Sequence, residues 1–187
     1  SRPSNYDNYI YNSGGFSGTY VSSCPVDHSA EGMFITDYAE KTGMDPFDAY
    51  CDILIKNGGL GLGIYFHMSE DDVAEILAHP LCVVSTDGLV GRENENPHPR
   101  SFGTMGRAYN LMAREKRFAS PEAAIRKMTG QAADFLGLAG KGYLRDGYDG
   151  DLLLLDMDAF ADTSTYANGS GLCGGVLRVY SRGKLVY

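Results

Sequence analysis

The stretch Leu81-Cys82-Val83-Val84-Ser85-Thr86-Asp87-Gly88 decides how the rest of the chain is interpreted. Its first half is a short apolar run, which predicts a strand buried on both faces, and it stops on small polar residues and Asp87. Barrels and open α/β sheets carry their catalytic groups at the carboxyl ends of such strands. We therefore expect Asp87 to face a cleft, where a carboxylate can act as a general base. The alternative is an Asp that only caps the following turn.

Two further residues of the following loop, His98 and Arg100, are candidates for binding a substrate. The planar fork of Arg100 suits a substrate carboxylate, but the same side chain could equally pair with a nearby Glu or with Asp87 itself. His67 follows the strand predicted at residues 60–66, on the same sheet edge as Asp87. It is a third substrate-binding candidate, and the alternative is a hydrogen-bonded loop histidine.

The residues before this stretch predict helices and two strands, one of them a brief strand at Tyr9-Ile10-Tyr11. A helix at 33–42 ends at Gly43, and a second begins with Asp45 as N-cap and Pro46 in its first turn. The apolar face predicted for the second helix consists of Phe47, Tyr50, Cys51 and Leu54. Strand 60–66, helix 70–78 and strand 81–86 then predict a βαβ unit with a parallel strand pair.

After the loop the pattern changes from helical to extended. A helix is predicted at 105–117 with Ala108, Leu111 and Met112 facing inward, followed by helices at 121–128 and up to Phe135. Short strands are predicted at 143–144, 151–156, 176–181 and 184–187, the last two joined by a turn at Arg182-Gly183. We therefore expect an α/β domain at 1–139 and a small antiparallel β segment at 140–187.

Composition limits the class of protein. Of the 187 residues, 43% are hydrophobic, which is enough for a core, and the net charge of -8 argues against nucleic acid or an anionic membrane as partner. There is no apolar run long enough to span a membrane, and the four Cys lack disulfide or metal spacing, so we expect a reducing, cytoplasmic location. The chain does not begin with Met, and we expect it to be a piece of a longer protein.

The residues themselves give no metal site. His-x-His, His-Glu-x-x-His and Cys-x-x-Cys patterns are all missing from the sequence. Gly59-Leu60-Gly61-Leu62-Gly63 precedes its strand instead of following one, so it does not fit a nucleotide loop. The acidic residues near 149–158 lack the spacing of a calcium loop.

Taken together, the motifs resemble those of one family, the N-acyl-D-amino-acid deacylases (D-aminoacylases) of the amidohydrolase superfamily. The resemblance covers roughly residues 30–187 and is carried by Ser69-Glu70-Asp71-Asp72-Val73, His79-Pro80-Leu81, Ser85-Thr86-Asp87-Gly88, Pro97-His98-Pro99-Arg100, Phe102-Gly103-Thr104, residues 123–129, Leu136-Gly137-Leu138 and residues 142–152. This chain departs from the family at Met105-Gly106, where Phe-Pro is common, and its first thirty residues match poorly.

The resemblance implies the C-terminal βα units of a TIM-barrel amidohydrolase, followed by a small antiparallel β-sandwich segment. It implies that the parent enzyme hydrolyses the amide bond of N-acyl-D-amino acids with a zinc-activated water. Asp87 would end the eighth barrel strand and act as general base and then as general acid. The zinc ligands would lie on earlier strands, so the resemblance implies that the 187 residues alone bind no catalytic zinc and are inactive.

Two other functions stay open. The same fold could hydrolyse a cyclic amide, or the segment could be a non-catalytic assembly module. We also expect a homo-oligomer or a repacked sheet, because a partial barrel exposes strand edges and an apolar face that must be covered.

Overall fold

The chain forms two units in the computed structural model, which describes residues 7–89 and 95–187. Each unit has its own hydrophobic core and is assembled from segments that are separated in the sequence. The first unit comprises Ser1–Glu70, Leu89–His98 and Thr165–Ser170, and the second comprises Asp71–Gly88, Pro99–Ser164 and Gly171–Tyr187.

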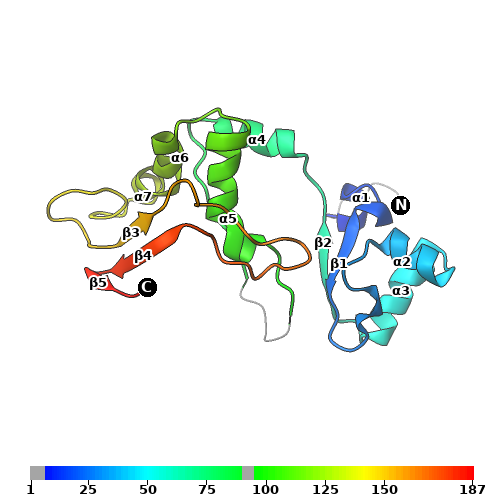
Figure 1. Ribbon diagram of the computed structural model, residues 1–187. Coiled ribbons are helices and arrows are strands. Elements are labelled where there is room, and N and C mark those ends of the chain that lie inside the picture. The colour runs from blue at the N-terminus through cyan, green and yellow to red at the C-terminus, as the bar shows by residue number, and fades with distance from the viewer. Residues whose placement is uncertain (1–6, 90–94) are drawn as a thin grey trace. The chain divides into compact units, whose positions relative to one another are not determined.

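The first unit combines a two-stranded antiparallel sheet with short helices (Figure 1). Strand β1 pairs with β2 so that Thr19 lies opposite Tyr65 and Tyr20 opposite Ile64, and all five residues of β1 are buried. The elements in order are α1 (Tyr9–Asn12), η1 (Phe16–Gly18), β1 (Thr19–Ser23), η2 (His28–Ala30), α2 (Ile35–Thr42), α3 (Pro46–Lys56) and β2 (Leu62–Tyr65).

The ends of α2 and α3 confirm the capping residues predicted from the sequence. Gly43 ends α2 in the left-handed conformation with φ of 71°, and its N–H donates to the carbonyls of Ala39 and Glu40. Asp45 caps α3, since its side chain accepts a hydrogen bond from the N–H of Phe47 at 2.9 Å. Pro46 occupies the first turn, where its missing N–H is not needed.

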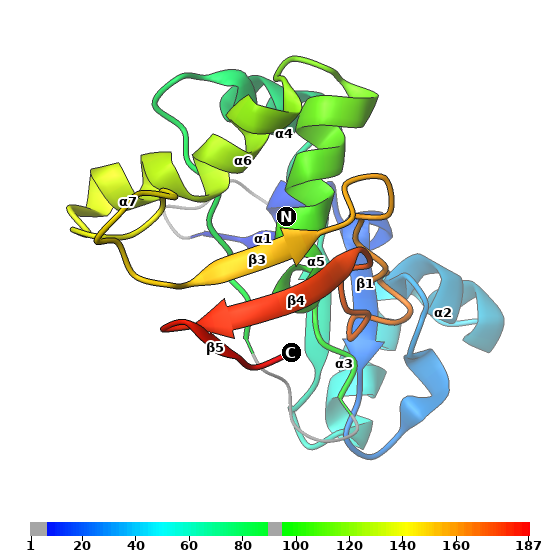
Figure 2. The same ribbon diagram turned by 60° about the vertical axis from the view of Figure 1, so that its left-hand side comes forward.

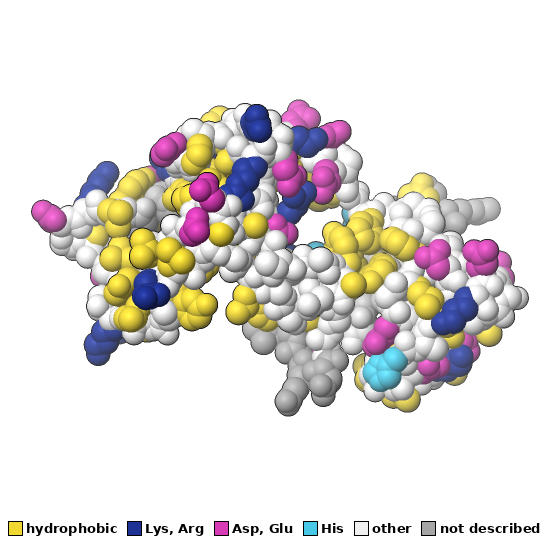
Figure 3. Space-filling model, viewed as in Figure 1, with side chains coloured by type: hydrophobic (Ala, Val, Ile, Leu, Met, Phe, Trp, Pro, Cys, Tyr) yellow, Lys and Arg dark blue, Asp and Glu magenta, His cyan; other side chains and the backbone are white. Residues whose placement is uncertain are grey.

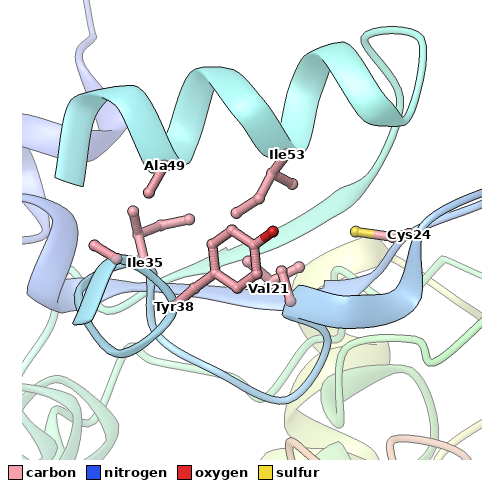
Figure 4. Packing of buried hydrophobic residues seen from close by; sticks show 8 residues of the cluster. Val21, Cys24, Ile35, Tyr38, Ala49 and Ile53 are labelled. Atoms are coloured by element: carbon pink, nitrogen blue, oxygen red, sulfur yellow. The ribbon is translucent and has the colours of Figure 1, made fainter. Parts of the chain in front are cut away.

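The core of the first unit lies between α3, α2 and β1 (Figure 4). Ala49 and Ile53 point from α3 toward Ile35 and Tyr38 of α2 and toward Val21 of β1. The predicted apolar face of α3 was therefore partly wrong: Phe47 is 60% exposed, whereas Ala49 is fully buried. The small side chain at position 49 lets α3 approach α2 closely. The inner face of α3 is therefore the one that allows close packing, not the one with the largest apolar side chains.

All four cysteines of the chain are free thiols, and Cys24 is the buried one. Burial raises the pKa of the Cys24 thiol, and the negative charges of Glu31 and Asp27 raise it further. The thiol therefore stays protonated at neutral pH and is a poor nucleophile.

The second unit packs a group of helices against a three-stranded antiparallel sheet in the order β3-β4-β5 (Figure 2). Arg182 and Gly183, with φ of 50° and 75°, form the predicted tight turn between β4 and β5. Its elements are α4 (Glu70–Ala78, whose first residue belongs to the first unit), α5 (Arg100–Tyr109), the π-helix η3 (Asn110–Glu115), α6 (Pro121–Met128), α7 (Gly130–Leu136), β3 (Leu152–Leu155), β4 (Val176–Ser181) and β5 (Lys184–Leu185).

The core of the second unit is formed largely by α5, η3 and α6. The predicted inward residues Ala108, Leu111 and Met112 are all buried, at 7%, 3% and 0% exposure. Gly106 lets α5 pack closely on the loop between β3 and β4, because a Cβ there would lie 2.6 Å from the backbone nitrogen of Asp162. No residue other than glycine fits this helix position without a backbone shift.

Truncating a core leucine of this unit should loosen it strongly. We expect Leu111→Ala to lower the free energy of local opening by about 2–5 kcal/mol, because it leaves a cavity in the core. The matched control is Leu144→Ala, whose side chain is 85% exposed and which should cost less than about 0.5 kcal/mol. Hydrogen exchange of the amides of η3 in the whole protein measures the difference. Equal exchange rates in the two variants would contradict this core assignment.

The predicted βαβ unit was wrong. Helix α4 forms as predicted, but β2 pairs antiparallel with β1, and residues 81–86 belong to no strand. Of these six residues only Val84 is buried, and Leu81 is 82% exposed. A strand needs a neighbouring strand for its backbone groups. Among the described residues, Cys82 and Val84 of this segment instead bond to Lys127 of α6 and Gln131 of α7, and no parallel strand pair forms.

Two shorter strand predictions also differ from the structure. Residues 9–12 form helix α1, because the side chain of Asn8 caps it by accepting from the N–H of Tyr11. Tyr143 and Leu144 lie in a loop, where the ring of Tyr143 stacks under the guanidinium of Arg145 at 4.7 Å.

The sheet of the second unit leaves many large apolar side chains exposed. Figure 3 shows hydrophobic side chains gathered where Figure 1 draws β3, β4 and β5. Leu153 and Leu154 are neighbours in β3 and are 60% and 54% exposed, although successive strand residues point to opposite faces. Both faces of this sheet therefore carry exposed leucines. No helix in the described part of the chain has the length and hydropathy needed to cross a membrane.

Candidate functional site

The turn that carries Asp87 is bound to the first turn of α5. The hydroxyl of Thr86 donates to the carbonyl of Arg100 at 3.0 Å. The hydroxyl oxygen of Thr86 also accepts a hydrogen bond from the N–H of Gly88 at 2.9 Å. One threonine side chain therefore closes the turn on itself and fastens it to the helix.

Arg100 holds Asp87 at two points. Its Nε donates to the backbone carbonyl of Asp87 at 2.9 Å, and its terminal nitrogen lies 2.9 Å from the Asp87 carboxylate. The Asp87 side chain is 88% exposed and that of Arg100 is 45% exposed, so the ion pair itself contributes little stability. Its effect is geometric, because the guanidinium fork fixes both the backbone and the carboxylate of one residue. Pairing with Asp87, one of the contacts considered for Arg100 from the sequence, is present.

Gly88 lets the Asp87 turn approach α5. A Cβ at this position would lie 2.7 Å from the Cα of Ser101 and 3.3 Å from the carbonyl oxygen of Arg100. Both are backbone atoms that cannot move aside alone. The turn can therefore reach the helix only with glycine at position 88.

Helices α6 and α7 bind the segment that leads to Asp87. The ammonium of Lys127 is buried and donates to the carbonyls of His79 and Cys82 at 2.6 and 2.9 Å. The side-chain amide of Gln131 donates to the carbonyls of Pro80 and Cys82 at 2.7 and 3.2 Å. Sequence reasoning missed both residues, because contacts over nearly fifty positions leave no local pattern.

His67 is held by the first helix of the first unit. Its Nε2 lies 3.0 Å from the carbonyl oxygen of Tyr9, and its ring stacks on the Tyr9 ring at 5.5 Å between centroids. The ring of Tyr65 lies 6.0 Å away. These contacts match the alternative of a hydrogen-bonded loop histidine. The sheet edge that His67 was predicted to share with Asp87 does not form.

His98 also belongs to the first unit, where its ring meets the ring of Tyr166 edge-on at 5.8 Å. Asn96 fixes the backbone there: its amide donates to Ser22 and to the carbonyl of Tyr166, and its side-chain oxygen accepts from Gly169. Asp87 and Arg100 lie in the second unit. Of the four predicted site residues, Asp87 and Arg100 are in direct contact, within the second unit.

Residues 7–89 and 95–187 contain no group of three or more His, Cys, Asp and Glu side chains that could hold a metal ion. A catalytic zinc needs about three protein ligands and one open position. The described residues therefore do not make up a zinc site by themselves.

Curated relatives resemble this chain over most of its length. An N-acyl-D-aspartate deacylase of Alcaligenes xylosoxydans xylosoxydans is 42% identical over 124 residues, which are 66% of this chain and 24% of that protein. A D-aminoacylase of the same organism is 33% identical over 169 residues, which are 90% of this chain and 34% of that protein. The chain thus spans about a quarter to a third of the length of these relatives.

Solved structures share the fold of this chain. The crystal structure of N-acyl-D-glutamate deacylase from Bordetella bronchiseptica, complexed with zinc and a phosphonate inhibitor, superposes with a TM-score of 0.78 at 28% identity. The match covers 95% of this chain and 36% of that one. A structure of D-aminoacylase with a binuclear metal centre gives 0.73 at 31% identity, covering 90% of this chain and 34% of that one.

The model of the amidohydrolase family matches residues 42–187. This range contains the turn at Asp87, its partner Arg100 and both helices that bind the preceding segment. The resemblance to the N-acyl-D-amino-acid deacylases, predicted from the motifs, is confirmed by these matches. The chain belongs to the amidohydrolase family.

Proposed function

We propose that the protein containing this chain hydrolyses the amide bond of N-acyl-D-amino acids, with Asp87 as the group that moves the proton. The observation that carries the proposal is the exposed carboxylate of Asp87, held at two points by Arg100. The names of the similar proteins, deacylases of N-acyl-D-aspartate and N-acyl-D-glutamate and a D-aminoacylase, supply the substrate class.

In the proposed reaction, water adds to the amide carbonyl and the C–N bond breaks, releasing a carboxylate and a free D-amino acid. Asp87 accepts the proton of the water as the C–O bond forms and returns it to the leaving amine nitrogen. A side chain that is 88% exposed can face both groups, and a positioned general base is worth roughly two to four decades in rate. Arg100 keeps the carboxylate oriented through both steps.

Zinc is part of the proposal for the whole protein, because the similar deacylase structure from Bordetella bronchiseptica holds zinc. A zinc ion would supply Lewis-acid activation of the carbonyl and of the water. Since the described residues contain no ligand set, we place its ligands elsewhere in the protein. His67, His98 and Arg100 stay predictions as substrate-binding residues.

The finer architecture is proposed on the same basis. We assign residues 1–139 to the C-terminal βα units of a TIM barrel, with Leu81–Thr86 as a barrel strand whose neighbours the rest of the protein provides. Residues 140–187 are assigned to a segment of a small β-sandwich. The other strands of the sandwich, provided by the rest of the protein, would cover the exposed leucines of β3. A homo-oligomer and a cytoplasmic location stay predictions, and light scattering of the isolated 187 residues tests the first.

The whole purified protein should release free amine from N-acetyl-D-amino acids and leave the L-isomers intact. A chelator should abolish this activity, and added zinc should restore it, because Asp87 alone cannot activate water sufficiently. The isolated 187 residues should be inactive with or without zinc. Hydrolysis only of cyclic amides would replace the proposed substrate, and inactivity on every amide tested would favour a non-catalytic assembly module.

A further inference from the structure

Lys127 is a buried cation whose partners are backbone carbonyls. It is 8% exposed, and its ammonium donates to the carbonyl of His79, just after α4, and to that of Cys82, in the segment that leads to Asp87. Lysine is rarely buried unless its charge is compensated. Hydrogen bonds from a charged donor are about twice as strong as neutral ones, so this side chain binds the segment firmly.

The same residue also binds the segment through its backbone. The carbonyl of Lys127 accepts from the N–H of Val84 at 3.3 Å. Val84 is 8% exposed and packs in the core with Ala124, which lies one helical turn before Lys127 on α6. Helix α6 therefore fixes residues 79–84 by side chain, backbone and apolar contact together.

Residues 86–88 are fixed separately by α5. Thr86 and Arg100 make the bonds described above, and Gly88 lies against Ser101. The stretch from His79 to Gly88 is thus anchored at both ends. The contacts of Lys127 with His79, Cys82 and Val84, which we call the α6 anchor, therefore set the path of the chain as it enters the Asp87 turn.

From these contacts we propose that Lys127 is a positioning residue for Asp87, acting through the carbonyls of His79 and Cys82. The inference rests on the proposed function, because it assigns to Asp87 a role that requires accurate placement. Gln131 is a weaker member of the same anchor, since its neutral amide shares Cys82 and adds Pro80. Neither residue touches the substrate in this proposal.

The test uses the whole enzyme and N-acetyl-D-amino acid hydrolysis. Lys127→Met keeps the length of the side chain and removes its charge, and it should lower kcat by roughly tenfold through misplacement of Asp87. KM and zinc content should not change, and Lys127→Arg should recover most of the rate. The matched control is Lys141→Met, in the same unit, whose exposed ammonium pairs with Asp149 and Asp151 and which should leave kcat unchanged.

A double variant separates positioning from folding. If Lys127 acts through Asp87, then Lys127→Met in an Asp87→Asn background should change kcat by less than about twofold. Should Lys127→Met not fold, Gln131→Ala replaces it in the same cycle, with a smaller expected loss. A wild-type kcat in folded single variants of both residues, or a full multiplicative loss in the double variant, would overturn the inference. Full activity of Asp87→Asn itself would instead overturn the proposed function, and the inference with it.

Discussion

Asp87→Asn in the whole enzyme should lower kcat for N-acetyl-D-amino acids by about two to four orders of magnitude, as loss of a general base does. The amide keeps the size of the carboxylate, and its oxygen can still accept from Arg100, so the turn should keep its shape. What the variant loses is the ability to take a proton from water and give it to the leaving amine. Steady-state kinetics measures the effect.

The fold and the zinc content should survive this change, because the carboxylate is exposed and the ion pair contributes little stability. Asp146→Asn is the matched control, since Asp146 is an exposed residue of the same unit, and its kcat should equal that of the wild type. If the Asp87→Asn enzyme kept more than about a tenth of the wild-type rate, Asp87 would not be the general base of the reaction.

Gly88→Ala should lower kcat by about a hundredfold without removing any chemical group from the site. The new Cβ would lie 2.7 Å from the Cα of Ser101 and 2.9 Å from the hydroxyl oxygen of Thr86. Thr86 can rotate, but the helix backbone at Ser101 cannot, so the Asp87 turn must move away from α5. Asp87 then loses the two contacts with Arg100 that orient its carboxylate.

Gly63→Ala serves as the comparison. The three atoms nearest its Cβ would all belong to the side chain of Tyr65, at 3.3 Å, and a side chain can shift by a few tenths of an ångström. We expect Gly63→Ala to retain wild-type kinetics. Equal kcat values for the two alanine variants would show that the close approach at Gly88 has no bearing on the position of Asp87.

Features that depend on neighbours in the sequence could be predicted from the sequence alone. Gly43 ends α2 and Asp45 begins α3 as expected, because a cap acts on backbone groups a few positions away. The side chain of Ser120, which caps α6 by accepting from the N–H of Ala123, acts over the same short distance. The turn at Arg182-Gly183 was predictable for the same reason.

Features that depend on distant partners could not be predicted. Residues 81–86 have the composition of a buried strand, yet composition does not tell which groups will bond to their backbone, and here Lys127 of α6 and Gln131 of α7 do. The buried face of α3 was misjudged because the fit of Ala49 against α2 depends on the distance between helices. Asp87 could be selected as a candidate by its position, but its anchors at Lys127 and Gln131 could not.

The pH dependence of kcat/KM tests the central claim, that Asp87 is the proton-transferring carboxylate, most directly. The wild-type enzyme should lose activity on the acid side as a carboxylate becomes protonated, since the protonated form cannot accept the proton of water. The residual activity of Asp87→Asn should lack this acid limb, because the titrating group is gone. An acid limb of the same shape and position in the variant would contradict the assignment and place the general base elsewhere in the protein.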